Sequence, residues 1–308
     1  MNYERQNFIN GQIVTADNLN YIEAGLEAIS ANARARNLLD NSDFRNPVNQ
    51  RAVTSTKWGG YNIDRWSMFP SGTRGDEHCG VVKNSYINLT STVDGYVDFY
   101  QKMERYDNIK GGTYTFTAKL LYNGNLVTSV CTFAMGGEGY GKNLTADGLV
   151  QFFSTSEGNV LIRVNNNAGA ANTVSLVWAA LYEGEYTADT LPEYIPKGYT
   201  AELLECQRYY LKLEGSANVS YPAYTVSTTQ TDVTIPIAVP MRVTPTLTVG
   251  DVGGISVYAP SSANTATAVV VQNSRDHAIA LRVTVDLSTA WRVACARFYT
   301  DVELSADL

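Results

Sequence analysis

Acidic residues are the first candidates for chemistry, because two carboxylates about 5–10 Å apart can hydrolyse a glycosidic bond. Most acidic residues here occupy turn-like contexts, as in Asp76-Glu77, Asp147 and Glu183-Gly184-Glu185. None of them forms a pair on adjacent strand positions beside a cluster of aromatic residues. We therefore interpret them as solvated turn carboxylates. Asp64, before Arg65-Trp66, is expected to be a structural partner of backbone or arginine groups rather than an acid catalyst.

The histidines and cysteines form no catalytic or metal-binding pattern. His78 and His277 are far apart in the chain, and neither a nucleophile elbow nor a helix with two ligating histidines is present. The cysteines are also widely spaced, without a Cys-x-x-Cys pair. Two of them, Cys131 and Cys295, lie in apolar strand-like runs that are typical of buried free thiols. We expect no catalytic residue, no metal, no cofactor and no structural disulfide.

Two segments rich in glycine or asparagine are interpreted as loops. The glycine-rich segment 136–141 lacks both the GxGxxG spacing and the lysine of a phosphate-binding loop. The segment Asn165-Asn166-Asn167 has the composition of a turn, and it lacks the carboxylates that a calcium site needs.

Aromatic residues remain as candidates, because sugars stack their apolar C–H faces on tyrosine and tryptophan rings. The chain has 20 tyrosines, and most of them lie in strand-like runs where core packing is the ordinary role. Tyr221 and Tyr224 flank Pro222, and Tyr258 precedes Ala259-Pro260, in contexts typical of loops. Exposed loop aromatics are better binding candidates than core ones. Tyr221, Tyr224 and Tyr258 are therefore candidate contacts for a saccharide receptor.

Composition and charge narrow the possible partners. The net charge is −7, and the basic residues are scattered, which argues against a nucleic-acid groove. Residues 1–10 are polar and do not resemble a signal peptide. No apolar stretch approaches the roughly 18 residues of a membrane span. We expect folding in a reducing cytoplasm, no nucleic-acid partner and no membrane insertion.

The N-terminal segment, residues 1–36, is predicted to contain a hairpin over residues 6–14 and then a helix capped by Thr15. The apolar positions of this helix follow the alternating steps of three and four that define a coiled-coil seam. Leucine at one seam position and isoleucine at the other favour three or four strands over two. An amphipathic helix packed on its own chain is the alternative. The seam residues are Leu19, Ile22, Leu26 and Ile29.

Residues 37–197 are predicted to form an antiparallel β-sandwich or jelly roll. Tyr114, Phe116, Ala118 and Leu120 alternate with polar residues, as in a half-buried strand. This run leads into Asn123-Gly124, which favours a two-residue hairpin turn. Residues 173–181 form a near-continuous apolar run, which predicts a central strand buried on both faces. Short strands without helical spacers indicate a sandwich.

Residues 198–308 are predicted to form a linker helix and a second, smaller β-sandwich. The helix is expected over about residues 200–213, where apolar residues recur at steps of three and four. Val233, Ile235, Ile237 and Val239 then alternate as in a strand. Pro236, on the opposite face of this run, predicts an edge position. The fold class expected for the chain is therefore mostly β, with two short helical segments.

Four segments resemble modular tail-fibre and receptor-binding proteins of bacteriophages. Residues 8–20 contain Phe-Ile-Asn-Gly and then Val-Thr-Ala-Asp-Asn-Leu-Asn, similar to the N-terminal module of many tail appendages. Residues 37–44 and 61–66 are similar to the "NLL-N-dF … DRW" opening of jelly rolls on phage fibres. Residues 181–210, with Leu-Tyr-Glu-Gly and Glu-Cys-Gln-Arg-Tyr-Tyr, resemble the sandwich-to-helix junction of those fibres. Residues 239–246 are similar to the "P-M-R-x-x-P" strand of their terminal domain.

The resemblance implies a homotrimer of the virion tail, with its N-terminus bound to other tail or baseplate proteins. It further implies an N-terminal attachment segment, a carbohydrate-binding-like jelly roll and a distal head, which would attach the particle to polysaccharide on the host bacterium. None of the four segments is a catalytic signature, so we expect an adhesin and not an enzyme. A tail-associated glycan depolymerase and a purely structural tail-tip protein remain the alternatives.

Overall fold

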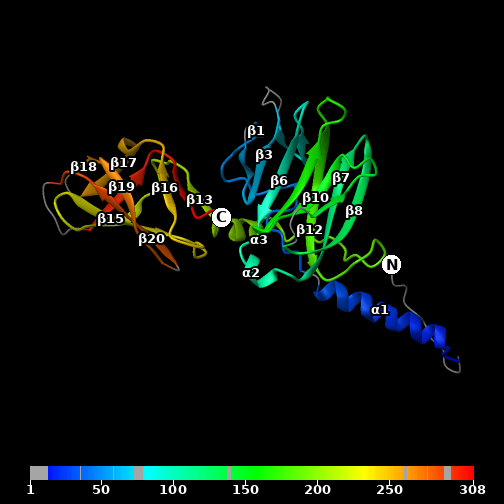
Figure 1. Ribbon diagram of the computed structural model, residues 1–308. Coiled ribbons are helices and arrows are strands. Elements are labelled where there is room, and N and C mark those ends of the chain that lie inside the picture. Colours follow the sequence, from blue (N-terminus) through cyan, green and yellow to red (C-terminus); the bar gives the residue numbers. More distant parts are fainter. Residues whose placement is uncertain are drawn as a thin grey trace. The chain divides into compact units, whose positions relative to one another are not determined.

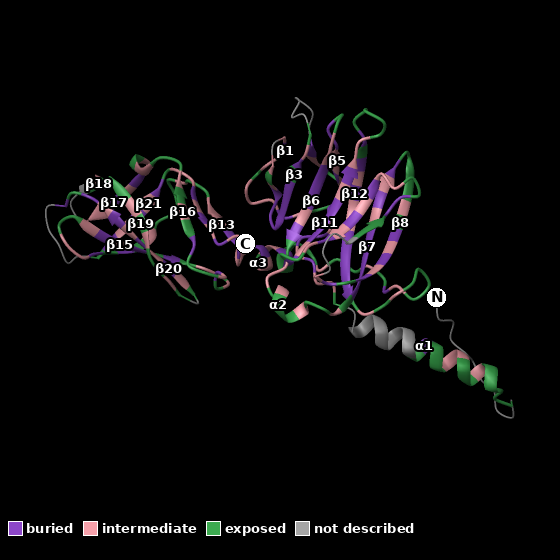
Figure 2. Cartoon of the chain, in the orientation of Figure 1, coloured by how far each residue is buried: buried purple, intermediate pink, exposed green. Residues whose placement is uncertain are grey.

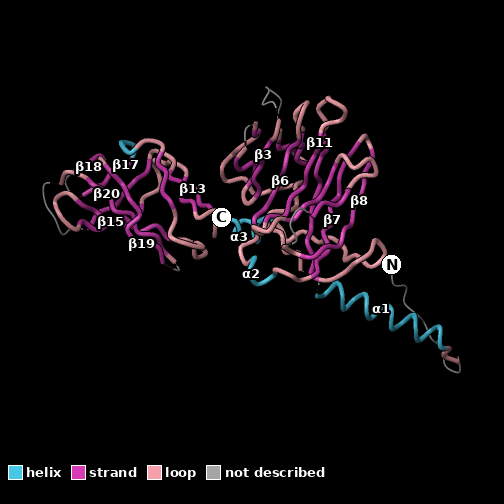
Figure 3. The backbone as a smooth tube through the Cα atoms, in the orientation of Figure 1, coloured by secondary structure: helices cyan, strands magenta, loops and turns pink. Residues whose placement is uncertain are grey.

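The computed structural model describes residues 13–34, 36–57, 59–72, 79–136, 140–259, 262–275, 277–287 and 293–308. Strands make up most of its regular structure, as predicted, and helices are short (Figures 1 and 3). The predicted hairpin over residues 6–14 lies almost wholly outside the described residues, and so does His78.

The chain divides into two compact units. The first, unit 1, comprises residues 1–47, 53–62 and 66–197, and the second, unit 2, comprises residues 48–52, 63–65 and 198–308. Unit 2 therefore begins its main part at Gly198 and also takes in two short segments that the sequence analysis assigns to the first β domain. Those two segments contain Gln50, Arg51 and Asp64.

Unit 1 is a sandwich of two six-stranded antiparallel sheets. One, sheet A, has the order β1 (Ser55–Thr56), β4 (Gly80–Lys83), β5 (Tyr86–Thr90), β12 (Thr173–Glu183), β7 (Thr113–Tyr122) and β8 (Asn125–Ala134). The other, sheet B, has the order β2 (Gly60–Ile63), β3 (Trp66–Pro70), β6 (Tyr96–Lys102), β11 (Asn159–Asn165), β10 (Val150–Ser154) and β9 (Tyr140–Asn143). A short helix, α2 (Tyr106–Ile109), follows β6.

Aromatic rings fill the space between the two sheets of unit 1. Phe116 of sheet A stacks on Phe152 of sheet B with 4.2 Å between ring centroids, and Trp66 stacks on Phe99 at 4.8 Å. All four of these residues are buried. Figure 2 shows buried stretches, in purple, along the strands of the sandwich. The central position of β12 and the hairpin between β7 and β8 confirm two predictions. Asn123 and Gly124 have φ values of 48° and 76°, which the tight turn between these strands requires.

Unit 2 is a smaller β-sandwich. Its larger sheet has the order β18 (Ser262–Thr265), β17 (Ile255–Ala259), β21 (Val293–Phe298), β14 (Tyr221–Thr225), β15 (Gln230–Pro236), β20 (Ala278–Thr284) and β19 (Ala268–Arg275). Its smaller sheet has the order β13 (Tyr210–Leu213), β22 (Val302–Ser305) and β16 (Thr246–Val249), and a 3-10 turn, η1 (Val252–Gly254), precedes β17. Aliphatic side chains such as Ile235, Val257 and Leu281 form the core.

Two predictions for unit 2 are wrong in detail. The helix expected over residues 200–213 ends early, because α3 spans Tyr199–Gln207 and residues 210–213 form strand β13. Backbone pairing of β13 with β22 outweighs the local helical spacing, since tertiary context routinely overrides propensity. Pro236 does not mark an edge strand: β15 lies between β14 and β20, and Pro236 is its last residue, where a missing N–H is tolerated.

The N-terminal helix is present as predicted. Helix α1 spans Ala16–Arg34, and the Thr15 hydroxyl accepts a hydrogen bond from the backbone N–H of Asn18 at 3.3 Å. The Asn18 side chain in turn accepts from the backbone N–H of Thr15 at 3.1 Å, which completes a reciprocal cap.

Candidate functional site

The outward face of the seven-stranded sheet in unit 2 carries the side chains that best fit a ligand. Along β17 and β21 alternate residues point into the core, among them Val257 and Ala296. The residues between them, Tyr258 on β17 and Arg297 on β21, therefore lie on the opposite face. The chain then bends after β21 at Tyr299, whose side chain is 45% exposed.

Three residues, Tyr258, Arg297 and Tyr299, form what we term the tyrosine platform. The hydroxyl oxygens of Tyr258 and Tyr299 are 2.5 Å apart, so the two rings are hydrogen-bonded to each other. The guanidinium carbon of Arg297 lies 4.8 Å from the centroid of the Tyr258 ring, within the range of a cation–π contact. The Arg297 Nε also donates to the Ser220 hydroxyl at 3.0 Å.

The two tyrosine hydroxyls of the platform share one hydrogen bond. The bond between the two hydroxyls raises the pKa of Tyr258 and lowers the pKa of Tyr299. Either hydroxyl can be the donor of this hydrogen bond. One hydroxyl proton is used in this bond, and the other remains available to a ligand, beside the guanidinium group of Arg297. The platform thus combines two aromatic rings with donors, as recognition of a sugar requires.

Of the three tyrosines predicted from sequence, only Tyr258 belongs to the platform. All three lie in strands rather than in loops, contrary to expectation. Tyr221 stacks on the core residue Phe298 with 4.9 Å between centroids, and burial raises the pKa of its hydroxyl. Tyr224 is 46% exposed and faces outward, opposite Val293 of β21 and Asp232 of β15.

Tyr299 and Arg297 were not predicted as site residues. Their signal in the sequence is weak, because both lie in an apolar C-terminal run where a core role is the ordinary interpretation. The alternation of β21 offers a clue: Ala294, Ala296 and Phe298 are buried, which leaves Arg297 outward and ends the strand just before Tyr299.

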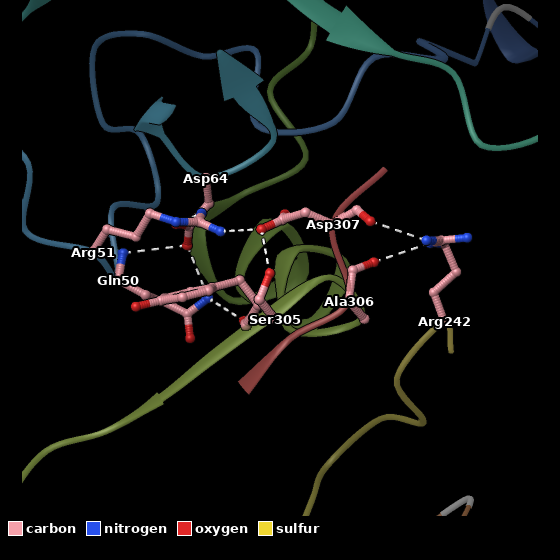
Figure 4. Close-up of polar contacts among 8 residues, drawn as sticks. Gln50, Arg51, Asp64, Arg242, Ser305, Ala306 and Asp307 are labelled. Atoms are coloured by element: carbon pink, nitrogen blue, oxygen red, sulfur yellow. Dashed lines mark hydrogen bonds and ion pairs between the residues drawn. The ribbon is translucent and has the colours of Figure 1, made fainter. Parts of the chain in front are cut away.

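A second polar cluster in unit 2 surrounds the buried carboxylate of Asp64 (Figure 4). Its Oδ1 lies 3.0 Å from Nη1 of Arg51, and its Oδ2 accepts from the side-chain amide of Gln50 at 2.8 Å and the backbone N–H at 3.2 Å. Arg51 also donates to Asp307, and its guanidinium carbon lies 3.7 Å from the centroid of the Tyr210 ring. We term Gln50, Arg51, Asp64, Tyr210 and Asp307 the Asp64 network.

Residues from three of the four segments with the family resemblance lie around this network. Arg65, next to Asp64, has a φ of 70° and places its guanidinium carbon 3.6 Å from the centroid of the Tyr209 ring. Arg242, from the Pro-Met-Arg segment, donates to the backbone carbonyls of Ala306 and Asp307, each at 3.1 Å. These motif residues therefore connect residues 50–51, 64–65 and 209–210 of unit 2 with the end of β22. Their role is structural.

The Asp64 network does not have the properties of a catalytic acid pair. Burial raises the pKa of Asp64, which alone would suit a general acid, and Arg51 and Gln50 lower it in part. However, the Asp64 side chain is only 1% exposed, and both of its oxygens already accept hydrogen bonds from protein donors. This arrangement confirms the prediction that Asp64 is a structural partner of backbone and arginine groups.

The seam residues of α1 can be placed in part. Leu19 and Leu26 are 53% and 61% exposed, and Ile22 is partly buried. Ile29 lies within the helix, but its side chain is outside the described residues. Two large apolar side chains seven residues apart thus lie uncovered on one face of the helix.

Comparisons with known proteins give no further guide to identity. No family model matches the chain, and no curated protein and no solved structure is similar to it. Among the described residues, no helix is long and apolar enough to cross a bilayer. The described part of the chain also holds no group of three or more histidine, cysteine, aspartate or glutamate side chains that could bind a metal ion.

Proposed function

We propose that this chain is the receptor-binding subunit of a tail fibre, on a bacteriophage or a phage-tail-like particle, and that it attaches the particle to glycans on a bacterial surface. The observation that carries the proposal is the tyrosine platform of unit 2. Two outward-facing tyrosine residues, hydrogen-bonded to each other and next to an arginine, form a surface that does not contribute to the core of unit 2. The resemblance of four sequence segments to tail-fibre proteins supplies the biological setting.

The platform suits a saccharide for a physical reason. An aromatic ring offers its face to the apolar C–H groups of a sugar, while hydroxyl and guanidinium groups bond to the sugar oxygens. Both rings are held in place before binding by their mutual hydrogen bond and by Arg297. Less conformational entropy is therefore lost on binding. Binding without cleavage is the expected activity.

A single platform of this size would bind weakly, so the proposal includes a homotrimer. Three copies joined through α1 would present three platforms, and linked sites raise the overall affinity by about 10²–10⁴-fold without new contacts. The exposed Leu19 and Leu26 are the surface that self-association would bury. The N-terminal segment would then join other tail or baseplate proteins, and the protein would be part of the virion tail.

The proposal is tested by adsorption of the full chain to host cells and to an array of bacterial glycans. The variant Tyr258→Ala/Tyr299→Ala should lose adsorption by at least about tenfold, since stacking of a ring on a ligand contributes about 1 kcal/mol or more. Tyr199→Ala is the matched control, because Tyr199 is 48% exposed and Tyr299 is 45% exposed, both in unit 2. The control should adsorb as the unchanged protein does.

Three results would contradict the proposal. Adsorption that is unchanged in the double variant would separate the platform from receptor binding. Failure of the protein to bind any bacterial envelope glycan would indicate a purely structural tail component. New reducing ends in polysaccharide incubated with the protein would show a depolymerase instead of an adhesin.

A further inference from the structure

Unit 1 has a polar depression on the outward face of sheet A, with a volume of about 450 Å³. Backbone pairing places Ser55 of β1 opposite Val81 of β4, Val81 opposite Asn88 of β5, and Asn88 opposite Ser175 of β12. Directly paired residues lie on the same face of a sheet. These side chains therefore form one outward row, and Lys83 and Thr90 flank it within the lining of the depression.

Two hydrogen-bond donors in this depression, the ammonium group of Lys83 and the amide nitrogen of Asn88, could bind a ligand. Among the described residues, no carboxylate pairs with the ammonium group of Lys83. The Asn88 Oδ1 accepts a hydrogen bond from the Ser175 hydroxyl at 2.7 Å, and the Asn88 Nδ2 has no acceptor among the described residues. Thr54 and Ser55 add hydroxyl groups on the opposite side of Lys83 and Val81. The depression thus combines one cation, an amide donor and hydroxyls with the apolar side chain of Val81.

The polar side chains on the outward face of sheet B differ from those in the depression, because they are paired with one another. There, Asp98 and Arg163 form two hydrogen bonds of 2.7 Å, and the Arg163 guanidinium carbon lies 3.6 Å from the centroid of the Tyr96 ring. Gln151 donates to Asn143 at 3.0 Å and accepts from Asn165 at 3.1 Å. These polar groups of sheet B pair with each other, whereas in sheet A neither Lys83 nor the Asn88 amide nitrogen has a polar partner among the described residues.

We propose that this depression binds a sugar unit that carries an acidic substituent, a carboxylate or a phosphate. The Lys83 ammonium group would pair with the acidic group, the Asn88 Nδ2 and the Ser55 hydroxyl would bond to ring oxygens, and Val81 would contact an apolar C–H edge. The formal charge of the whole chain is −7, so its general field repels anions, and binding of an acidic sugar has to come from a local cation.

The proposal adds a second site, in unit 1, to the platform of unit 2. It rests on the proposed function for the origin of the sugar, a bacterial envelope, but not for the binding event itself. The depression thus adds a preference for acidic sugars, which depends on Lys83 and not on the platform. The two sites can be tested independently of each other, because no residue is shared between them.

The test is ligand-observed NMR on the full chain with glucuronic acid, glucose 6-phosphate and glucose as probes. We expect saturable binding of at least one acid and at least about tenfold weaker binding of glucose, because a hydrogen bond to a charged group contributes about 1.5–3 kcal/mol. Binding of the uronic acid alone would indicate a carboxylate-bearing glycan, and binding of the phosphate ester alone would indicate a phosphorylated one.

Matched variants assign the binding to the depression. Lys83→Met should weaken binding of the acid by at least about tenfold, whereas Lys119→Met should leave it unchanged, since Lys119 lies on β7 of the same sheet outside the depression. Tyr258→Ala/Tyr299→Ala should also bind the acid normally. No saturable binding of either acid, or equal affinity in Lys83→Met, would overturn this inference. Loss of cell adsorption in the platform variant alone would still uphold the proposed function.

Discussion

Arg51 and Asp64 form a buried ion pair in which Nη1 of the arginine lies 3.0 Å from Oδ1 of the aspartate. The Asp64 side chain is 1% exposed and the Arg51 side chain 13%, so water screens this pair little. Arg51 also donates to Asp307 near the end of β22. One guanidinium group therefore compensates two carboxylates and ties residues 48–52 and 63–65 to the main part of unit 2.

Arg51→Met should destabilise unit 2, because it leaves the carboxylate of Asp64 buried without a cation. We expect a loss of about 3 kcal/mol in the free energy of unfolding, measured by urea denaturation. The control is Arg45→Met, which breaks the pair between Arg45 and Asp43. That arginine side chain is 45% exposed, so its loss should cost less than about 1 kcal/mol. Equal losses in the two variants would contradict the structural role of Arg51.

The cost of removing Arg51 should depend on pH. Burial raises the pKa of Asp64 above its usual value, against the opposing charge of Arg51, and the charge of Asp307 raises it further. A raised pKa means that the folded state holds the proton more tightly than the unfolded state. This group's contribution to stability is then greatest below the unfolded pKa of about 3.9 and falls as the pH rises toward the folded pKa.

Without Arg51 the folded pKa of Asp64 rises further, so the pH range over which stability falls becomes wider. We therefore expect Arg51→Met to be closer to the unchanged protein at about pH 4 than at about pH 7. Adding Asp64→Asn should remove most of this difference, because the neutral amide does not titrate. Denaturation curves at both pH values check this. A pH-independent cost that persists in the double variant would show that Arg51 acts through packing alone.

Local patterns predicted the elements that depend on nearby residues. The alternation from Tyr114 to Leu120 and the turn at Asn123-Gly124 are sufficient for the β7–β8 hairpin, and the Thr15 cap with its seam is sufficient for α1. Asp64 was also correctly interpreted as a structural carboxylate. The motif did not identify its partners, Arg51 and Gln50, which are 13 and 14 residues away.

Features that depend on distant pairing could not be predicted. Residues 210–213 have helical spacing but form a strand, because β22, near the chain end, supplies the backbone partners. The tyrosine platform likewise joins Tyr258 to Tyr299, which are 41 residues apart, and only the pairing of β17 with β21 brings them together. Loop-like composition around Pro222 and Pro260 was a poor guide, since the tyrosines beside these prolines lie in strands.

The four cysteines should differ in their reactivity toward thiol reagents. All four are thiols; Cys79, Cys131 and Cys206 are buried, and Cys295 is partly exposed. Burial raises the pKa of Cys131 to about 12, so its nucleophilic thiolate is scarce at neutral pH. A maleimide should therefore label Cys295 first in the folded protein, as peptide mapping would show. Early labelling of Cys131 would contradict the buried position of this strand.

Cys295 labelling also offers a control on the platform. Backbone pairing places Cys295 directly opposite Tyr258, on the outward face of the larger sheet of unit 2. A bulky maleimide there should obstruct glycan binding at the platform while leaving the depression of sheet A in unit 1 unaffected. Cys295→Ser should bind glycans normally and should be insensitive to the reagent.

The last prediction concerns assembly of the chain through the seam residues of α1. Leu26 is 61% exposed in the single chain, and burying a leucine side chain contributes about 1.5–3 kcal/mol. In a trimer this gain is made three times, so Leu26→Asp should shift the full chain from trimer toward monomer in sedimentation velocity runs. Ala24→Asp is the matched control, because Ala24 is also an exposed residue of α1. It is two residues from Leu26 and therefore lies on the opposite side of the helix. A trimer that persists in Leu26→Asp would show that another surface joins the subunits, and a monomer in the unchanged protein would remove self-association from the proposed function.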